Sequence, residues 1–244
     1  MQNNETGRMS EHLRQVAAAM GVTVEEPQLA KFAVYYEFLL ETNQKVNLTR
    51  ITEPLDVAVK HFGDSFFLLK PGLIPEGARV ADIGTGAGVP GIPLAIMRPD
   101  LRVVLVDSLR KRTVFLTEAV ERLELANVEV VWSRAEDLGH KPEYRERYDV
   151  VLARAVASLN VLTELCLPLV KKGGVFLALK GPRAQEELAQ AQTAIALLGG
   201  GGATMLEAEL PIQPELRTIL QIQKRKPTPA KFPRKAGLPE RTPL

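Results

Sequence analysis

Residues 80–91 constrain the fold most strongly, because they join a buried-strand pattern to a glycine-rich turn. The apolar run 80–83 leads into Gly84, Gly86 and Gly88, and a second apolar run ends about 20 residues later at Asp107. In α/β sheets, such a turn lets the backbone approach a ligand, and the later carboxylate accepts hydrogen bonds from ribose hydroxyls. The pattern therefore predicts an α/β protein that binds an adenosine-containing cofactor.

Alternating strand and helix patterns after residue 78 predict a mostly parallel sheet with helices on both faces. We expect strands over 78–83, 102–107, 127–132, 148–153 and 174–180, with helices over 90–97, 109–124, 157–170 and 183–198. Two last strand patterns, 203–210 and 216–223, are joined by a short link, which predicts an antiparallel pair.

We expect the chain to divide into three parts: a helical extension (1–72), an α/β domain (73–224) and a basic tail (225–244). In the extension, apolar spacing predicts helices over 10–20, 27–41 and 53–69, and residues 1–9 are expected to be disordered.

The end of the chain is strongly basic. From Lys224 onward it holds seven Lys or Arg residues and one Glu. Two interpretations stay open: an arm that binds phosphates, or a solvated tail kept soluble by its charge.

Composition narrows the class of protein. Hydrophobic residues make up 45% of the chain and charged residues 25%, as in soluble globular proteins. No apolar run reaches the roughly 18 residues that span a bilayer, and the polar start lacks a secretory segment. One cysteine excludes an internal disulfide, and with three widely spaced histidines it argues against a metal site. We therefore expect a cytoplasmic protein with no membrane partner.

Two cofactors compete for the glycine turn. Residues 86–91 match the G-x-G-x-x-G pattern of nicotinamide enzymes, with Asp107 placed for the ribose. Against this, Pro90 and Pro93 remove donors at the helix start, where a pyrophosphate needs N–H groups. Asp82 could instead lie near the positive charge and ammonium of a sulfonium amino acid. Both aspartates could also simply cap a turn or helix.

The end of the fourth strand favours chemistry without a general base. It lacks the Asn/Asp-Pro-Pro-aromatic signature of amine methylation, and Cys166 is expected to be a buried thiol. Guanine N7 attacks without losing a proton, so alignment and electrostatics suffice. We therefore assign no catalytic residue, with Arg154 as a candidate that donates to guanine O6, to the cofactor carboxylate, or to a structural carboxylate.

The pattern D-x-G-x-G-x-G, the acidic second strand and the terminal hairpin resemble class I S-adenosylmethionine methyltransferases, which have a Rossmann-like, mostly parallel seven-stranded sheet. From about residue 35 onward the chain further resembles the RsmG (GidB) family of bacterial 16S rRNA guanine-N7 methyltransferases. The motifs that carry this resemblance are Asn47-Leu48-Thr49, His61-x-x-Asp64-Ser65, Asp82 to Gly91, Arg134-Ala135-Glu136, Ala153-Arg154-Ala155, Lys180-Gly181 and Phe232 to Gly237.

The resemblance implies an enzyme that methylates N7 of guanine 527 in 16S rRNA, with 16S rRNA or the small ribosomal subunit as its partner. The alternatives are a nicotinamide-dependent oxidoreductase and a noncatalytic RNA-binding assembly factor. From the residues and the resemblance together, the expected S-adenosylmethionine-binding residues are Asp82, Gly84, Gly86, Gly88, Val89, Asp107, Ser108, Leu109, Ala135, Glu136 and Arg154.

Several cations and one aromatic ring are candidates for RNA contact. We expect Lys180, Arg183, Arg234 and Lys235 to bind RNA, whereas the cluster 110–112 favours neither RNA nor a structural role. Trp132 is expected to be a packed strand residue. His61, Asp64 and Ser65 fit a local polar network as well as an RNA contact. We expect the protein to be a monomer.

Overall fold

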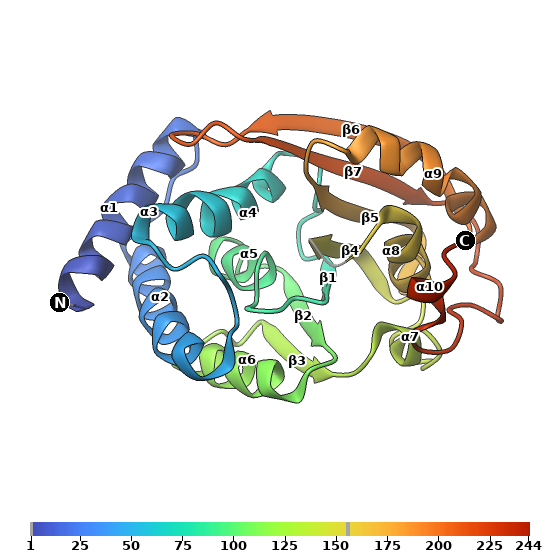
Figure 1. The fold of residues 1–244 in the computed structure, drawn as a ribbon, viewed down its shortest axis with the longest axis horizontal. Helices are drawn as coiled ribbons and strands as arrows, with labels where there is room; N and C mark the ends of the chain where they lie inside the picture. The colour runs from blue at the N-terminus through green and yellow to red at the C-terminus, as the bar shows by residue number, and fades with distance from the viewer. Residues whose placement is uncertain (1, 155–156) are drawn as a thin grey trace.

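The computed structural model describes residues 2–154 and 157–244, and it contains a seven-stranded sheet in the order β3-β2-β1-β4-β5-β7-β6 (Figure 1). The first five strands are parallel, and β7 runs antiparallel to both β5 and β6. The strands are β1 (Arg79–Ile83), β2 (Arg102–Asp107), β3 (Val128–Trp132), β4 (Tyr148–Arg154), β5 (Val170–Lys180), β6 (Gly200–Glu209) and β7 (Leu216–Lys224). The predicted fold class and terminal hairpin are confirmed.

Helices cover both faces of the sheet (Figure 1). They are α1 (Gln2–Ala19), α2 (Glu26–Val46), α3 (Pro54–Val57), α4 (Asp64–Phe66), α5 (Gly91–Met97), α6 (Arg110–Arg122), α7 (Ala135–Leu138), α8 (Leu159–Cys166), α9 (Ala184–Leu197) and α10 (Leu238–Arg241). One hydrophobic cluster joins α1, α2, α5 and α6 to one face, and a second joins α7, α8 and α9 to the other. Buried strands of this kind read as continuous apolar runs, which explains the accuracy of the strand predictions.

The N-terminal helices belong to the main core. Met9, Leu13 and Val16 of α1 lie in the same buried cluster as Val80 of β1. The expected disorder of residues 1–9 is therefore wrong from residue 2 onward, because a spacing of about one helical turn puts these apolar side chains on one buried face.

The expected helix over 53–69 is instead divided into short segments. A π-helical turn, Ala58–Gly63, separates α3 from α4, and a 3-10 turn, Phe67–Leu69, ends the segment. This irregular helix places side chains at the carboxyl ends of the strands. π-Helical turns are often found at functional sites.

The basic tail packs against α7 and α8 (Figure 1), so the interpretation of a freely solvated tail is wrong. Phe232 is buried in the second cluster, and the carbonyl of Pro233 lies 2.7 Å from Nε2 of His140. Arg145 donates to the carbonyls of Phe232 and Thr228, both at 2.8 Å. Buried apolar contact and backbone hydrogen bonds together hold this segment on the domain.

Across residues 2–154 and 157–244, no helix combines the length and hydropathy that a membrane crossing requires. Ala155, which one of the family-like motifs contains, lies outside these ranges.

Candidate functional site

The glycine turn after β1 needs glycine for its backbone conformation. Gly84, Gly86 and Gly88 have φ values of 67°, 62° and 91°, which L side chains rarely adopt. A Cβ on Gly88 would also lie 2.5 Å from a side-chain carbon of Ile92, whereas the nearest atom to a Cβ on Gly86 is 4.0 Å away. Gly88 therefore allows close packing against Ile92, whereas Gly86 leaves open backbone that a ligand can approach closely.

Asp82 is a fully buried carboxylate at the end of β1. Its Oδ2 accepts hydrogen bonds from the Gly91 N–H at 2.9 Å and the Thr85 hydroxyl at 2.6 Å, so the capping role is real. Its Oδ1 is buried with no hydrogen-bond partner among the described residues. Burial raises the pKa of Asp82 to about 6. An unpaired buried carboxylate oxygen fits a positively charged or N–H-bearing group, as S-adenosylmethionine carries.

Asp107 links the turn to the end of β2. Its Oδ2 accepts the Gly86 N–H at 3.0 Å, its Oδ1 accepts the Leu109 N–H at 2.9 Å, and Arg112 lies 3.4 Å away. Ser108 offers its carbonyl to the Trp132 indole, and the apolar side chain of Leu109 is 44% exposed. Asp107 thus has a structural role in addition to the predicted ribose contact, and Leu109 presents an apolar surface beside it.

The third predicted contact region is the start of α7. Ala135 and Glu136 are both buried. Glu136 accepts hydrogen bonds from Arg134 and from the Gly237 N–H of the tail, both at 3.0 Å. Burial opposes ionisation of this carboxyl group, but these hydrogen bonds prevail and lower its pKa. The side chain of Glu136 is therefore engaged with the tail, which leaves its backbone for the predicted cofactor contact.

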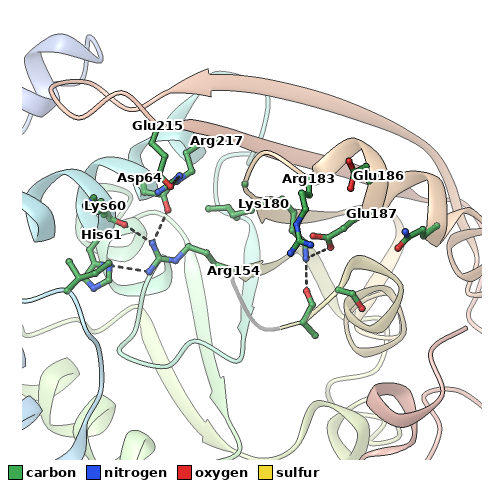
Figure 2. A pocket seen from close by; sticks show the side chains of 16 residues that line it. Lys60, His61, Asp64, Arg154, Lys180, Arg183, Glu186, Glu187, Glu215 and Arg217 are labelled. Atoms are coloured by element: carbon green, nitrogen blue, oxygen red, sulfur yellow. Dashed lines mark hydrogen bonds and ion pairs between the residues drawn. The ribbon is translucent and has the colours of Figure 1, made fainter.

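A cavity of about 950 Å³ lies at the carboxyl ends of β4 and β5 (Figure 2). The glycine turn is not among the residues that line this cavity. Because β1 neighbours β4 in the sheet, the turn lies next to the cavity along the same sheet edge. In open α/β sheets, ligands bind at this edge. The arrangement provides adjacent places for a cofactor, over β1 and β2, and for a substrate, over β4 and β5.

Arg154 enters this cavity from β4 and is fixed by three partners. Its Nη1 donates to Oδ2 of Asp64 and to the Lys60 carbonyl, both at 2.9 Å, and its Nη2 lies 3.3 Å from Nδ1 of His61. Arg217 donates to the other oxygen of Asp64 at 3.1 Å. Figure 2 shows Asp64 between the two arginines. Arg154 thus pairs with a structural carboxylate, which is one of the three roles considered for it, and its positive charge lies at the cavity wall.

His61 is buried beside this cation. Burial, and then the charge of Arg154, lower the pKa of His61 to about 3, so the ring is neutral at physiological pH. Sequence reasoning noted His61 and Asp64 but missed Arg217, because its approach to Asp64 depends on a contact across 153 residues.

The four predicted RNA-binding cations have different surroundings. Lys180 is buried and contacts Glu187 at 2.7 Å and the Ala157 carbonyl at 2.6 Å, whereas Arg183 is exposed at the cavity wall. Lys235 is exposed.

Arg234 contacts buried Glu164 through Nη2 at 2.6 Å and Nε at 2.9 Å. Lys180 and Arg234 thus have structural partners, and their contact with RNA stays a prediction.

Two expectations about single residues have clear outcomes. Cys166 is a buried thiol, as predicted, and burial raises its pKa. Trp132 is not packed: it lies at the edge of the sheet with 58% of its surface exposed. The apolar run 127–132 does not reveal that this strand lies at the edge of the sheet, where its side chains are less covered.

Comparisons with known proteins agree with this geometry. The family model for rRNA small subunit methyltransferase G (GidB) matches residues 28–213. A "Ribosomal RNA small subunit methyltransferase G" from Pelotomaculum thermopropionicum is 47% identical over 236 residues, which cover 97% of this chain and 99% of the relative.

Solved structures show the same fold at low identity. A "predicted O-methyltransferase" from Agrobacterium tumefaciens has a TM-score of 0.54 at 18% identity, covering 67% of this chain and 81% of its own. A "SAM dependent methyltransferase" from Aquifex aeolicus has a TM-score of 0.50 at 19% identity, covering 65% and 89%. The family match over residues 28–213 and the 47% identity to the relative from Pelotomaculum thermopropionicum establish that the chain belongs to the rRNA small subunit methyltransferase G family.

Proposed function

We propose that this protein transfers a methyl group from S-adenosylmethionine to N7 of a guanine in 16S rRNA, at position 527 by the conventional rRNA numbering. The family description and the relative's name support methylation of small-subunit rRNA. The choice of atom rests on the cavity at the ends of β4 and β5, where His61 is a weak base and the carboxylates of Asp64, Glu187 and Glu215 are held by Arg or Lys side chains. We further propose that the protein acts as a monomer in the cytoplasm.

The residues around the glycine turn fit S-adenosylmethionine. The unpaired Oδ1 of Asp82 can accept an N–H or lie near a positive charge, and Asp107 can accept from ribose hydroxyls. Leu109 and Ala135 provide small or apolar surface for the adenine. When bound, the cofactor supplies an electrophilic methyl group, and these residues hold it at the edge of the cavity.

The cavity suits a nucleophile that needs no deprotonation. Among the lining residues that the structure describes, His61 has a pKa near 3, and a hydrogen bond from Arg217 lowers the pKa of Glu215. Neither group would take a proton from a substrate at neutral pH. Guanine N7 has an in-plane lone pair and no proton to lose, so Arg154 and its neighbours act by orientation and positive potential.

The nicotinamide alternative does not fit the helix start. The Gly91 N–H, which a pyrophosphate would need, donates to Asp82 at 2.9 Å, and the Ile92 N–H donates to the Gly88 carbonyl at 2.7 Å. A noncatalytic assembly factor would not need the unpaired oxygen of Asp82.

The direct test uses purified protein, labelled S-adenosylmethionine, and small subunits or naked 16S rRNA from cells that lack this enzyme. We expect one labelled 7-methylguanine, mapped by mass spectrometry to position 527. Label on another atom, or no transfer to either RNA, would contradict the proposal. Asp107→Ala should weaken S-adenosylhomocysteine binding in calorimetry, and unchanged binding would remove Asp107 from the cofactor site.

A further inference from the structure

Trp132 is an exposed aromatic ring that lies beside the expected cofactor residues and is not among the residues lining the cavity. It is the single tryptophan of the chain and lies at the carboxyl end of β3, the edge strand of the sheet beside α6 (Figure 1). With 58% of its surface exposed, it leaves a large apolar ring in contact with water. Tryptophan is enriched at interfaces, where a partner covers its apolar ring and its N–H finds an acceptor.

The ring is held in one orientation. Its Nε1 donates to the Ser108 carbonyl at 3.1 Å, and the guanidinium carbon of Arg110 lies 5.3 Å from the ring centroid. A hydrogen bond at one edge and a cation at one face fix the indole before any ligand arrives. Pre-orientation reduces the entropy that binding would otherwise cost.

The surroundings of the ring are positively charged. The first turn of α6 holds Arg110, Lys111 and Arg112, and this fully described helix has no acidic residue there. Arg112 is the cation of the three that lies near Asp107, while Arg110 and Lys111 are exposed. An aromatic surface beside unpaired cations matches the two parts of a nucleotide, a base and a phosphate.

The position of the ring is close enough to the target cavity for one RNA segment to reach both. Trp132 pairs with Asp107 in the parallel register, so it lies at the same sheet edge as the cofactor residues. Three strand spacings separate β3 from β4, or about 14 Å, which a short stretch of nucleotides can span.

We propose that Trp132 and Arg110 form a stacking platform for an unpaired base that flanks the target guanine in the RNA substrate. This inference rests on the proposed function, since it assumes an RNA substrate. It adds a second RNA contact, separated from the cavity, whose recognition is by stacking and therefore tolerant of base identity.

Because the chain has one tryptophan, its fluorescence reports on this residue alone. We expect a hairpin RNA that carries the loop around guanine 527 to quench the emission, and S-adenosylhomocysteine alone to leave it unchanged. Quenching by S-adenosylhomocysteine alone would assign Trp132 to the cofactor site and overturn the proposal. RNA binding without quenching, seen by anisotropy of a labelled hairpin, would overturn it as well.

Variants test the energetic role. Trp132→Ala should weaken RNA binding about 5- to 150-fold, the usual effect of losing one aromatic stacking partner, and Trp132→Phe should restore most of it. Arg110→Ala keeps the fluorophore and should weaken both binding and quenching. Both alanine variants should bind S-adenosylhomocysteine as the wild type does, and this binding would demonstrate that they fold.

If the hairpin does not bind, methylation of small subunits decides. A raised KM for subunits in Trp132→Ala, restored in Trp132→Phe, supports the platform, and unchanged KM values in Trp132→Ala and Arg110→Ala overturn it. The proposed function would fail differently: wild-type protein would then methylate neither RNA nor subunits.

Discussion

Replacing Arg234 with alanine tests whether the basic tail is a structural element or an RNA-binding arm. The side chain of Glu164 is 1% exposed, and its oxygens accept the Arg234 backbone N–H at 2.8 Å as well as two guanidinium contacts. The hydrogen bond to Glu164 raises the pKa of Arg234, as expected for a tight pair. Without the guanidinium, the buried carboxylate keeps one backbone donor from this residue.

Removing one partner of a buried ion pair usually costs about 3–5 kcal/mol. Because the Arg234 side chain is 24% exposed, water can reach the gap, and we expect Arg234→Ala to lower the free energy of unfolding by about 3 kcal/mol. For a chain of this size each kcal/mol shifts Tm by about 2–4 °C, so Tm should fall by about 6–12 °C. Arg234→Lys keeps the charge but loses the two-pronged contact and should lie between.

Urea unfolding of the wild type, Arg234→Ala, Glu164→Gln and the double variant gives the coupling energy of the pair, which should exceed about 1 kcal/mol. RNA affinity measured at several salt concentrations tests the alternative, in which Arg234 contacts RNA. If stability changes by less than about 0.5 kcal/mol while RNA binding weakens and its salt slope falls by about one, Arg234 is an RNA contact and the structural reasoning is wrong.

Three further predictions concern the site. The pKa of Asp82, about 6 in the folded state against 3.8 for the ordinary group, means that the folded protein binds this proton more tightly. Wild-type stability should therefore fall relative to Asp82→Asn as pH rises from about 4 to about 6, by up to about 3 kcal/mol, and a pH-independent difference in urea unfolding would contradict this. Gly91→Ala places a Cβ 2.2 Å from a leucine methyl of β2, whereas the nearest atom to a Cβ at Gly86 is 4.0 Å away. Gly91→Ala should therefore lower the free energy of unfolding by more than the roughly 1 kcal/mol expected for Gly86→Ala. Equal losses of stability in the two variants would refute the crowding argument. Arg154→Ala removes a charge that lowers the pKa of His61, so NMR titration should show that pKa rising above 3, while kcat falls and S-adenosylhomocysteine binding is kept. Loss of cofactor affinity would instead make Arg154 a cofactor contact.

Sequence patterns predicted the sheet well because each signal is local. The expected strand 102–107 coincides with β2, and 78–83 differs from β1 by one residue, since runs of Val, Ile and Leu mark strands buried on both faces. The glycine turn was also readable, because positive φ values at Gly84, Gly86 and Gly88 permit few other residues.

Contacts between distant residues could not be read in this way. Nothing near Arg234 in the sequence indicates Glu164, 70 residues earlier, and nothing near Asp64 indicates Arg217. Charge counts left the tail open between an RNA-binding arm and a solvated segment, because they record how many cations are present, but not which of them a buried carboxylate already holds.

The distinction between held and unheld cations bears on how this protein can bind RNA. A net charge of only +2 gives little general attraction, so the placement of individual cations decides where phosphates bind. Arg154 and Arg217 share Asp64, and Arg234 holds Glu164; these pairs set the shape and potential of their surroundings but release fewer counterions. If the proposed platform binds RNA, exposed cations such as Arg110 should carry the salt-dependent part of binding. Removing the cations of the cluster 110–112, for which the sequence favoured neither role, should therefore reduce the salt slope of RNA binding. Loss of Arg154, Arg217 or Arg234 should instead act first on stability and on the geometry of the cavity.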